Sequence, residues 1–385
     1  MKGDLRMKIV RYKLGNNIDY GKLEDNVIKK IGGNIFDDYY LTEKTIPRTE
    51  VEILPPVSPP NIIAIGLNYE QHAREGGHEL PERPVIFIKA TTSLIGPEED
   101  IVLPKIAPDK VDYEAELAVI IGKKAKNVEK DDIDDYILGY TCANDVSARD
   151  CQLELDEQWA RGKSFDTFCP LGPWIETSIN PNNCNITSRL NDEVMQNSNT
   201  SDMIFDVREL VSYCSKNMTL LPGTVIITGT PEGVGVAREP QVFLEAGDII
   251  EIEIEGIGVL KNHVIESDSE QKKKGSKIAK VWSKYFGTVQ LTPHLFDKFK
   301  TYIDDGIQEE VIIEVMKITS QKNKGNPSSY MVSILNNFIE QGIYTMKDLK
   351  EKGEGTGEQI RKNHSTKKKE TKREELEELY RQGYR

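Results

Sequence analysis

The sequence predicts an α+β protein, with a small N-terminal domain and a mixed, β-rich body followed by an all-α C-terminal domain. Three observations support this class. Short runs rich in β-branched residues recur between residues 61 and 255 and are separated by Gly, Pro and Asp turns, which indicates a mixed sheet rather than a βαβ repeat. After residue 290 the apolar residues follow helical spacing. The net charge changes sign, because residues 1–266 hold 27 basic and 45 acidic side chains (−18) and residues 267–385 hold 23 and 18 (+5).

Composition also sets the segment boundaries. Prolines at 55, 56, 59 and 60 form a stiff, non-helical connection, and the chain becomes polar and lysine-rich after residue 266. We expect five segments: a small N-terminal domain at 1–58, the body at 59–266, a linker at 267–289, a helical domain at 290–350 and a charged tail at 351–385.

The elements follow in chain order. The N-terminal domain is expected to begin with a strand at 7–12, and the body is expected to contain strands at 61–66, 85–89, 113–121, 139–144, 224–228 and 249–255. Helices are expected at 295–303, 311–318 and 330–339, with a charged helical segment at 367–380.

Several classes of protein are excluded by composition. The five cysteines form no CxxC pair, and their odd number fits reduced intracellular thiols. The N-terminus lacks the apolar core of a signal peptide, and no apolar run approaches the roughly 18 residues of a membrane span. We therefore expect a soluble, cytoplasmic protein with no membrane partner. The acidic body is not expected to bind nucleic acid, whereas the basic C-terminal part is a candidate.

Two acidic residues lie on one face of the predicted strand at 113–121. Side chains alternate along a strand, so Glu114 and Glu116 are expected about 6–7 Å apart where the strand enters a core. Like charges held beside apolar surface raise one another's pKa unless a cation lies between them. A hard divalent cation with oxygen ligands would meet that need. The alternative is a solvated strand edge that happens to carry two acids.

Asp145 supplies a third carboxylate where a strand gives way to a predicted helix. One interpretation is a helix N-cap. The other makes Asp145 a metal ligand beside Glu114 and Glu116, which would leave coordination sites free for water and substrate.

The segment at 66–78 follows a strand and ends in a Gly-Gly pair. A short helix would place His72 and Glu75 on one face, where the carboxylate can fix the imidazole tautomer and favour its action as a general base. Gly76 and Gly77 would allow a short lid to hinge. The alternative is a surface helix with an ordinary i,i+3 pair.

Two further motifs are more often structural than functional when taken singly. Lys163 precedes an aromatic, turn-rich stretch. The glycine-rich loop at 228–235 follows an apolar strand and could offer N–H groups and a hydroxyl to a substrate carboxylate, but it lacks P-loop spacing.

Taken together, these motifs resemble the fumarylacetoacetate hydrolase family. The matching pieces are NIIAIGLNY (61–69), DYEAEL (112–117), NDVSARD (144–150), GKSFD (162–166) and TGTP (228–231). The resemblance is close over residues 55–266 and loose over 7–54, the variable N-terminal arm. It implies a β-rich roll of the fumarylacetoacetate hydrolase type, a homodimer, and a catalytic domain at 59–266 that binds Mg²⁺ or Mn²⁺.

The resemblance also implies roles for individual residues. Glu114, Glu116 and Asp145 would bind the metal. His72 and Glu75 would form the lid dyad that activates water or moves a proton, and Lys163 would stabilise enolate charge. The remaining three positions, near the substrate, would be Arg149, Gln152 and Thr230.

The implied substrates are 2-oxo acids and related dicarbonyl compounds, which react through a metal-stabilised enolate. Water placed by His72 would give acylpyruvate-type C–C hydrolysis. Loss of CO₂ would give oxaloacetate decarboxylation, and a proton shuttle would give tautomerisation or isomerisation of a hydroxydienoate. The same residues serve all these reactions, so the residues alone do not choose among them.

The C-terminal part is similar to the DnaD-type domain of replication-initiation proteins. The similarity lies in NPSSYMVSILNNF (326–338) and GIYT (342–345). That domain has Tyr, Ile and Trp at four-residue spacing, and this chain has Tyr330, Ile334 and Phe338. The same spacing is used by any helix that buries an apolar stripe. DNA binding would depend on the lysine-rich residues 367–373, for which the alternative is a solvated tail.

We therefore predict a metal-dependent enzyme of 2-oxo-acid chemistry joined to a small helical domain, for which DNA is a candidate partner. The competing hypothesis is a non-catalytic, dimerising platform for that helical domain. The intact set of candidate site residues argues for the enzyme. The residues do not exclude an artificial joining of two genes near 267–290, which a transcript spanning that region would test.

Overall fold

A computed structural model describes residues 7–267, 278, 281–282, 284–286, 293–320 and 327–352 of the 385-residue chain. The chain forms two compact units, Met1–Ser267 and Asp268–Arg385. Among the helices of the described residues, none is long and apolar enough to cross a membrane.

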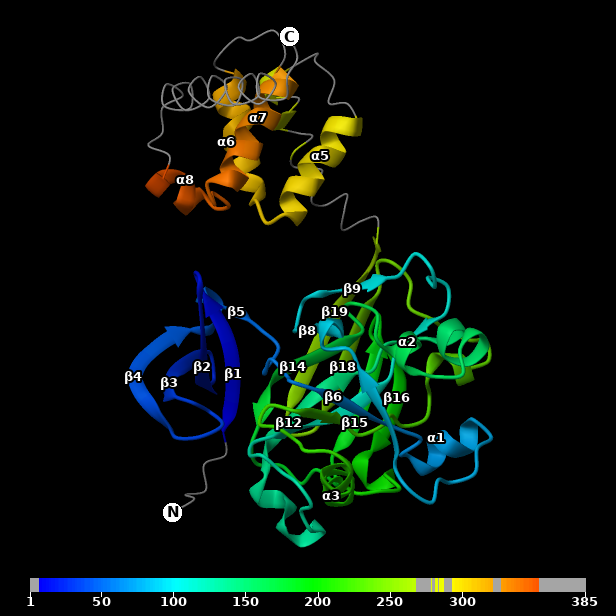
Figure 1. The fold of residues 1–385 in the computed structure, drawn as a ribbon. Helices are drawn as coiled ribbons and strands as arrows, with labels where there is room; N and C mark the ends of the chain where they lie inside the picture. The colour runs from blue at the N-terminus through cyan, green and yellow to red at the C-terminus, as the bar shows by residue number, and fades with distance from the viewer. Residues whose placement is uncertain are drawn as a thin grey trace, which may run out of the picture. The chain divides into compact units, whose positions relative to one another are not determined.

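The first unit begins with an antiparallel sheet joined by short turns (Figure 1). Its strands are β1 (Lys8–Leu14), β2 (Asn17–Glu24), β3 (Val27–Gly33), β4 (Tyr39–Pro47) and β5 (Glu52–Ile53). Inward-facing residues such as Tyr12, Leu23 and Ile28 form a small core between them. β1 also pairs with β14 (Cys169–Glu176), so this small sheet is continuous with the body.

The larger sheet runs in the order β4-β3-β2-β1-β14-β12-β11-β17-β6-β7. Its body strands are β6 (Ile62–Gly66), β7 (Val85–Lys89), β11 (Ala115–Ile121), β12 (Ile137–Asn144), β14 and β17 (Val225–Ile227). Every residue of β11 is buried, because this strand pairs with β12 and β17 inside the sheet and both of its faces pack against apolar residues. The parallel pairing of β17 with β6 makes the sheet mixed.

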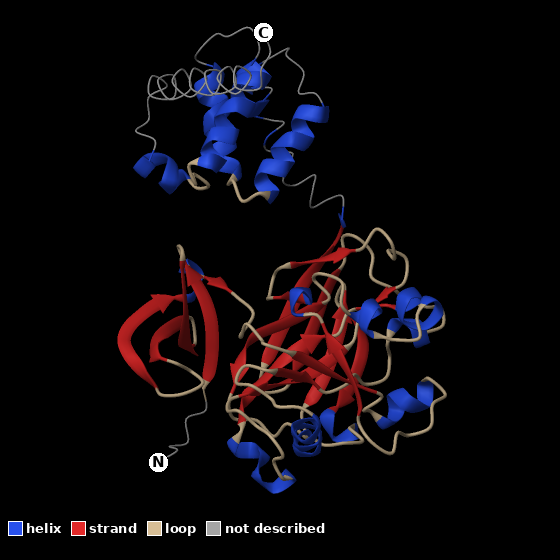
Figure 2. Ribbon diagram, in the orientation of Figure 1, coloured by secondary structure: helices blue, strands red, loops and turns tan. Residues whose placement is uncertain are grey.

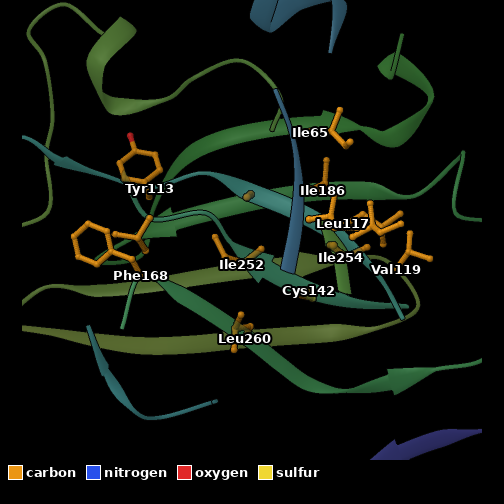
Figure 3. Close-up of a cluster of buried hydrophobic side chains, with 14 of the residues drawn as sticks. Ile65, Tyr113, Leu117, Val119, Cys142, Phe168, Ile186, Ile252, Ile254 and Leu260 are labelled. Carbon is orange, nitrogen blue, oxygen red and sulfur yellow. The ribbon is translucent and has the colours of Figure 1, made fainter. Parts of the chain in front are cut away.

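A second, five-stranded sheet has the order β16-β15-β18-β19-β9. These strands are β16 (Glu193–Asn199), β15 (Asn185–Leu190), β18 (Ile249–Ile254), β19 (Gly258–Glu266) and β9 (Asp100–Leu103). Leu117 and Cys142 of the large sheet lie in one buried cluster with Ile186, Ile252 and Leu260 of the second sheet (Figure 3). The core therefore lies between two sheets, as in a β-roll.

Short elements complete the first unit. They are the strands β8 (Leu94–Ile95), β10 (Val111–Asp112) and β13 (Ser147–Ala148), the helices α1 (Glu70–Glu75), α2 (Ala160–Lys163) and α3 (Val207–Asn217), a π-helical segment Asp150–Leu155, and 3₁₀ turns at Arg48–Glu50, Thr91–Ser93, Lys130–Asp135, Thr200–Asp202 and Gly235–Ala237. Asp206 caps α3, because its side chain accepts a hydrogen bond from the Glu209 N–H.

The predicted α+β class is confirmed, and one difference in strand bounds affects the site. The strand predicted at 113–121 begins at Ala115, so Glu114 lies in the connection after β10. There the Asn144 side chain accepts the Glu114 N–H at 3.0 Å, and the Glu114 carbonyl accepts the Asp145 N–H at 2.9 Å. A side-chain hydrogen bond thus replaces part of the strand ladder at this point.

The described elements of the second unit are helices (Figure 2). They are α5 (Pro293–Asp304), α6 (Glu309–Ser320), α7 (Pro327–Glu340) and α8 (Met346–Lys352). The unit has its own core, which includes Trp282, Phe299 and Val315. Ile334 and Phe338 of α7 are buried in it, which confirms the core interpretation of that stripe. Most of the predicted linker, the segment 367–380 and the tail beyond Lys352 lie outside the described residues.

Candidate active site

One cavity in the first unit, with a volume of about 330 Å³, gathers the candidate residues. All nine line it, namely His72, Glu75, Glu114, Glu116, Asp145, Arg149, Gln152, Lys163 and Thr230. They come from segments up to 158 residues apart, and the large sheet brings these segments together at the ends of β11, β12 and β17.

The three predicted metal ligands form a buried group. Carboxylate oxygens of Glu114, Glu116 and Asp145 all lie within 4.8 Å of one another. Glu116 lies in β11, and Asp145 directly follows β12, the strand that pairs with β11. A two-residue strand, not a helix, comes after Asp145. The Asp145 carboxylate contacts two lysines instead of helix N–H groups. The N-cap interpretation of Asp145 is therefore wrong.

Cationic side chains contact two of these carboxylates directly. Lys163 Nζ lies 2.6 Å from Glu114 Oε2 and 2.9 Å from Asp145 Oδ2, and Arg149 Nη1 lies 2.8 Å from Glu114 Oε1. Burial alone would raise the pKa of Glu114, but Lys163 and Arg149 hold it below its usual range. Burial alone would lower the pKa of Lys163, but Asp145 and Glu114 raise it. Both groups therefore stay charged in the cavity wall.

The electrostatic surroundings of Glu116 differ from those of Glu114. Its Oε2 accepts a hydrogen bond from the Gly229 N–H at 2.7 Å, and no ion pair is found for it among the described residues. Burial, and next the charges of Asp145 and Glu114, raise its pKa well above the usual value. A buried carboxylate beside two others lacks a positive partner, which is the need a divalent cation would meet. The donor set, three carboxylates, fits Mg²⁺ or Mn²⁺.

Arg149 is held from behind by Asp112. Its Nε donates to Asp112 Oδ2 at 2.8 Å, and Asp112 also accepts the N–H groups of Gly235 and Val236 at 2.8 and 3.0 Å. Arg149 Nη1 donates to Gln152 Oε1 at 2.8 Å. Arg149 Nη2 is buried without a hydrogen-bond partner among the described residues. It is thus a fixed donor for a ligand in the cavity.

The predicted dyad lies on α1, the short helix expected in this segment. His72 Nδ1 and Glu75 Oε1 are 2.9 Å apart. Glu75 also accepts the Gly233 N–H, at 3.1 Å to Oε1 and 3.0 Å to Oε2. Because Glu75 anchors the imidazole at Nδ1, Nε2 is the ring nitrogen left to exchange a proton in the cavity.

Apolar side chains also line the cavity. Phe87 and Trp159 pack edge to face, with ring centroids 5.8 Å apart, and Leu153 and Val236 are further apolar lining residues. Thr230 Oγ1 accepts a hydrogen bond from Gln196 Nε2 at 2.8 Å, which orients the hydroxyl.

Three residues of this region were missed by the sequence analysis: Lys89, Asp112 and Gln196. Each contacts a candidate residue from behind, and none lines the cavity. Asp112 lay within a quoted motif, but its partner Arg149 is 37 residues away. Lys89 ends a strand in which Ile88 is exposed and Lys89 is buried, the reverse of what the residue types suggest. No local signal distinguishes these positions.

Ionisable side chains gathered in a buried cavity are typical of an enzyme. The sequence comparison gives the family. The model described as fumarylacetoacetate (FAA) hydrolase C-terminal matches residues 61–265, and the chain belongs to this family. A model described as Rv2993c-like, N-terminal matches residues 7–56. Residues 279–353 match a model described as replication initiation and membrane attachment, which confirms the predicted resemblance of this part to a replication-initiation domain.

Individual relatives are similar over the first unit. An uncharacterized protein of Methanocaldococcus jannaschii is 53% identical over 212 residues, which is 55% of this chain and 86% of that protein. The mitochondrial oxaloacetate tautomerase Fahd2a of Rattus norvegicus is 46% identical over 224 residues, 57% of this chain and 71% of that protein. A crystal structure of 5-carboxymethyl-2-hydroxymuconate delta-isomerase from Mycobacterium smegmatis is 42% identical with a TM-score of 0.62, and the match covers 68% of this chain and 100% of that one.

Proposed function

We propose that the first unit is a metal-dependent enzyme that interconverts the keto and enol forms of a 2-oxo acid by moving a proton. Oxaloacetate is the first candidate substrate. The observation that carries the proposal is the placement of the carboxylates Glu114, Glu116 and Asp145 and the dyad His72–Glu75 on one cavity of about 330 Å³. A cavity of this size suits a small acid.

The three carboxylates would hold Mg²⁺ or Mn²⁺. When bound, such a cation supplies a Lewis acid that polarises the carbonyl and favours the enolate. We assign the catalytic domain to residues 59–266. Glu116 lies in its buried strand β11, and Glu114 and Asp145 lie in the connections before β11 and after β12.

The protein's own groups would then carry the proton and the charge. His72 accepts and returns the proton at Nε2, because Glu75 fixes Nδ1. The Lys163 ammonium offsets enolate charge from its place beside Glu114 and Asp145. Arg149 Nη2, the donor without a partner, and the oriented Thr230 hydroxyl would bind substrate oxygens. Gln152 would hold Arg149 in place.

Two kinds of relative favour isomerisation over hydrolysis and decarboxylation. The rat relative is named a tautomerase and the mycobacterial structure a delta-isomerase. Both names describe a proton shift, which needs neither an incorporated water nor loss of CO₂. Hydrolysis of an acylpyruvate remains the second candidate, because His72 is placed on the cavity where it could activate water.

The test is an NMR time course of the purified protein with Mn²⁺ or Mg²⁺, against oxaloacetate and then a simple acylpyruvate, each with and without chelator. We expect faster keto–enol interconversion of oxaloacetate that chelator abolishes. Pyruvate as the product would instead establish decarboxylation, and cleavage of the acylpyruvate would establish hydrolysis. Bound metal without turnover of either compound would support the non-catalytic platform.

The C-terminal match supports a second proposal, a DNA-associated role for the second unit. A fragment containing residues 268–385 should shift a DNA probe at low salt, with affinity that falls steeply as salt rises. An absence of binding at low salt would contradict it.

The family resemblance also supports a homodimer, which light scattering of the full chain would test. The five buried free thiols fit a reducing compartment such as the cytoplasm.

A further inference from the structure

A buried lysine, Lys89, lies behind the candidate metal ligands. It ends β7, and its side chain is 0% exposed, whereas the neighbouring Ile88 is 46% exposed. Its Nζ contacts Asp145 Oδ1 and the carbonyl oxygen of Lys163, and lies 3.5 Å from that of Val146. Lys89 does not line the cavity, so it does not contact a ligand there. It can act only through its charge or through its neighbours.

Lys89 belongs to a larger set of buried charges. We call this set the buried charge cluster; it consists of Lys89, Asp112, Glu114, Glu116, Asp145, Arg149 and Lys163, and each of them is less than a tenth exposed. Ion pairs join six of these residues, and Glu116 lies within 4.8 Å of two of them. With every carboxylate ionised, four anions and three cations leave the cluster at −1.

The net charge of the buried charge cluster affects which ligands bind. A bound divalent cation brings the cluster to +1. Without Lys89 the same loaded cluster would be neutral. A positive, water-poor cluster attracts the anionic oxygens of a 2-oxo acid, and a neutral one does so far less. The same ammonium must repel the metal, because like charges oppose one another in a buried site. Lys89 therefore acts in opposite directions on the two ligands.

We propose that Lys89 sets the charge of the loaded site, weakening cation binding so that the site keeps the positive charge that binds an anionic substrate. This inference rests on the proposed function, since it takes the carboxylates as metal ligands and a 2-oxo acid as substrate. It adds a specificity-determining residue outside the cavity. The plain alternative is an ion pair with Asp145 that only supports the fold.

The experiment uses the full chain and two titrations by calorimetry. Mn²⁺ is titrated into metal-free protein, and oxalate, a planar dianion with the paired oxygens of a 2-oxo-acid enolate, is titrated into Mn²⁺-saturated protein. Lys89→Met should bind Mn²⁺ at least about tenfold more tightly and oxalate at least about tenfold more weakly, because one unit charge acting on a doubly charged ion over about 10 Å at an effective dielectric of about 20 exceeds that scale. A purely structural lysine would weaken both or change neither, and either result would overturn the proposal.

Controls separate the possible failures. Lys261→Met removes a lysine that pairs with Glu251 on neighbouring strands β19 and β18, and both affinities should stay within about twofold of wild type. If Lys89→Met does not fold, Lys89→Gln keeps a neutral donor for Asp145 and should shift both affinities in the same two directions. Wild-type protein that binds no Mn²⁺ would refute the proposed function. Wild-type protein that binds both ligands, without opposite shifts in the variants, would refute only the role of Lys89.

Discussion

At the scale of the residue, two carboxylates close together on one chain segment occupy opposite electrostatic environments. Glu114 lies against Lys163 and Arg149, and Glu116 faces two other carboxylates and one backbone N–H. The sequence analysis placed both on one face and inferred mutual repulsion, which holds for Glu116. It could not foresee the compensation of Glu114, because its cations come from residues 149 and 163, whose positions depend on the tertiary fold.

The raised pKa of Glu116 predicts how the metal-free protein responds to pH. When folding raises the pKa of a carboxyl group, that group stabilises the folded state fully at pH values below its usual pKa of 4.5. The stabilisation is lost as the pH rises through the raised pKa. Stability in chelator should therefore fall as pH rises above about 4.5. Glu116→Gln should flatten that fall. Thermal melts in chelator across pH 5–8 would check this, and parallel curves for the two proteins would contradict it.

The same substitution tests the metal site. Glu116→Gln removes a candidate ligand charge, so Mn²⁺ affinity should drop more than about 100-fold, beyond the 10- to 100-fold typical of changes outside the ligand set. Stabilisation of the fold by added Mn²⁺ should disappear. Metal-dependent stabilisation that survives in this variant would refute Glu116 as a ligand.

Substitution of His72 should lower turnover without changing metal binding. His72→Asn should lower kcat about 10²- to 10⁴-fold, the contribution of a positioned general base, and leave Mn²⁺ affinity unchanged. His263→Asn, on β19, is the matched control and should turn over like wild type. The measurement is steady-state kinetics with calorimetry on the same samples. An equal loss of turnover and metal affinity would argue that His72 supports structure instead of moving a proton.

At the scale of the element, the glycine-rich loop after β17 contacts both the candidate metal ligand Glu116 and the His72–Glu75 dyad on α1. Gly229 donates to Glu116, Gly233 donates to Glu75, and Gly235 donates to Asp112. One loop thus holds a candidate ligand, the dyad and the anchor of Arg149. The sequence analysis named a substrate carboxylate as a possible acceptor for N–H groups of this loop, and a structural role as the commoner one. In the structure these three N–H groups bind the protein's own carboxylates, which lie far away in sequence.

Gly233 is a position in this loop where a side chain is not tolerated. Its φ is +94°, and an added Cβ would lie 2.5 Å from the Met195 carbonyl oxygen. Gly233→Ala should therefore shift the loop, release Glu75 and lower kcat at least about tenfold. Gly247→Ala is the matched control, because Gly247 also has a positive φ, +104°, but open space around its Cβ position.

Both alanine variants should lose about 1–2 kcal/mol of stability through the left-handed backbone alone, measured by chemical denaturation. Only Gly233→Ala should also lose turnover. Similar kinetics for the two variants would show that the contact between Gly233 and Glu75 is not needed for catalysis.

At the scale of the whole molecule, the chain contains two units with separate cores. Periodicity predicted the strands β1, β6, β7, β11, β12, β17 and β18 and the helices α5, α6 and α7, because alternation and helical spacing are local properties of the sequence. It missed β2 to β5 of the N-terminal sheet, β14, β15, β16 and β19 of the body, and helix α3. The strand order could not be predicted in this way, since β1 pairs with β14 and β17 with β6 across more than 160 residues. The site was predicted through motifs, and its supporting residues Lys89, Asp112 and Gln196 were missed because nothing local marks them.

Separate cores predict that the first unit works alone. A fragment of residues 1–267 should keep Mn²⁺ binding and turnover within about twofold of the full chain, because every described residue that lines the cavity belongs to this unit. Calorimetry and the NMR assay on fragment and full chain would check this. A fragment that folds but binds no Mn²⁺ would show that the second unit contributes to the site.

The pairing of β1 with β14 has a consequence for how the protein is made. Lys8 pairs with Glu176, and the Met7 N–H donates to Thr177, so the first strand must wait until residue 177 has left the ribosome. Until then the start of β1 has an unpaired edge, because β5 pairs only with Tyr12 and Lys13, and such an edge is prone to wrong pairing with other chains. Slower translation over the first 177 residues would lengthen this exposure, and a chaperone that covers β1 would shorten it.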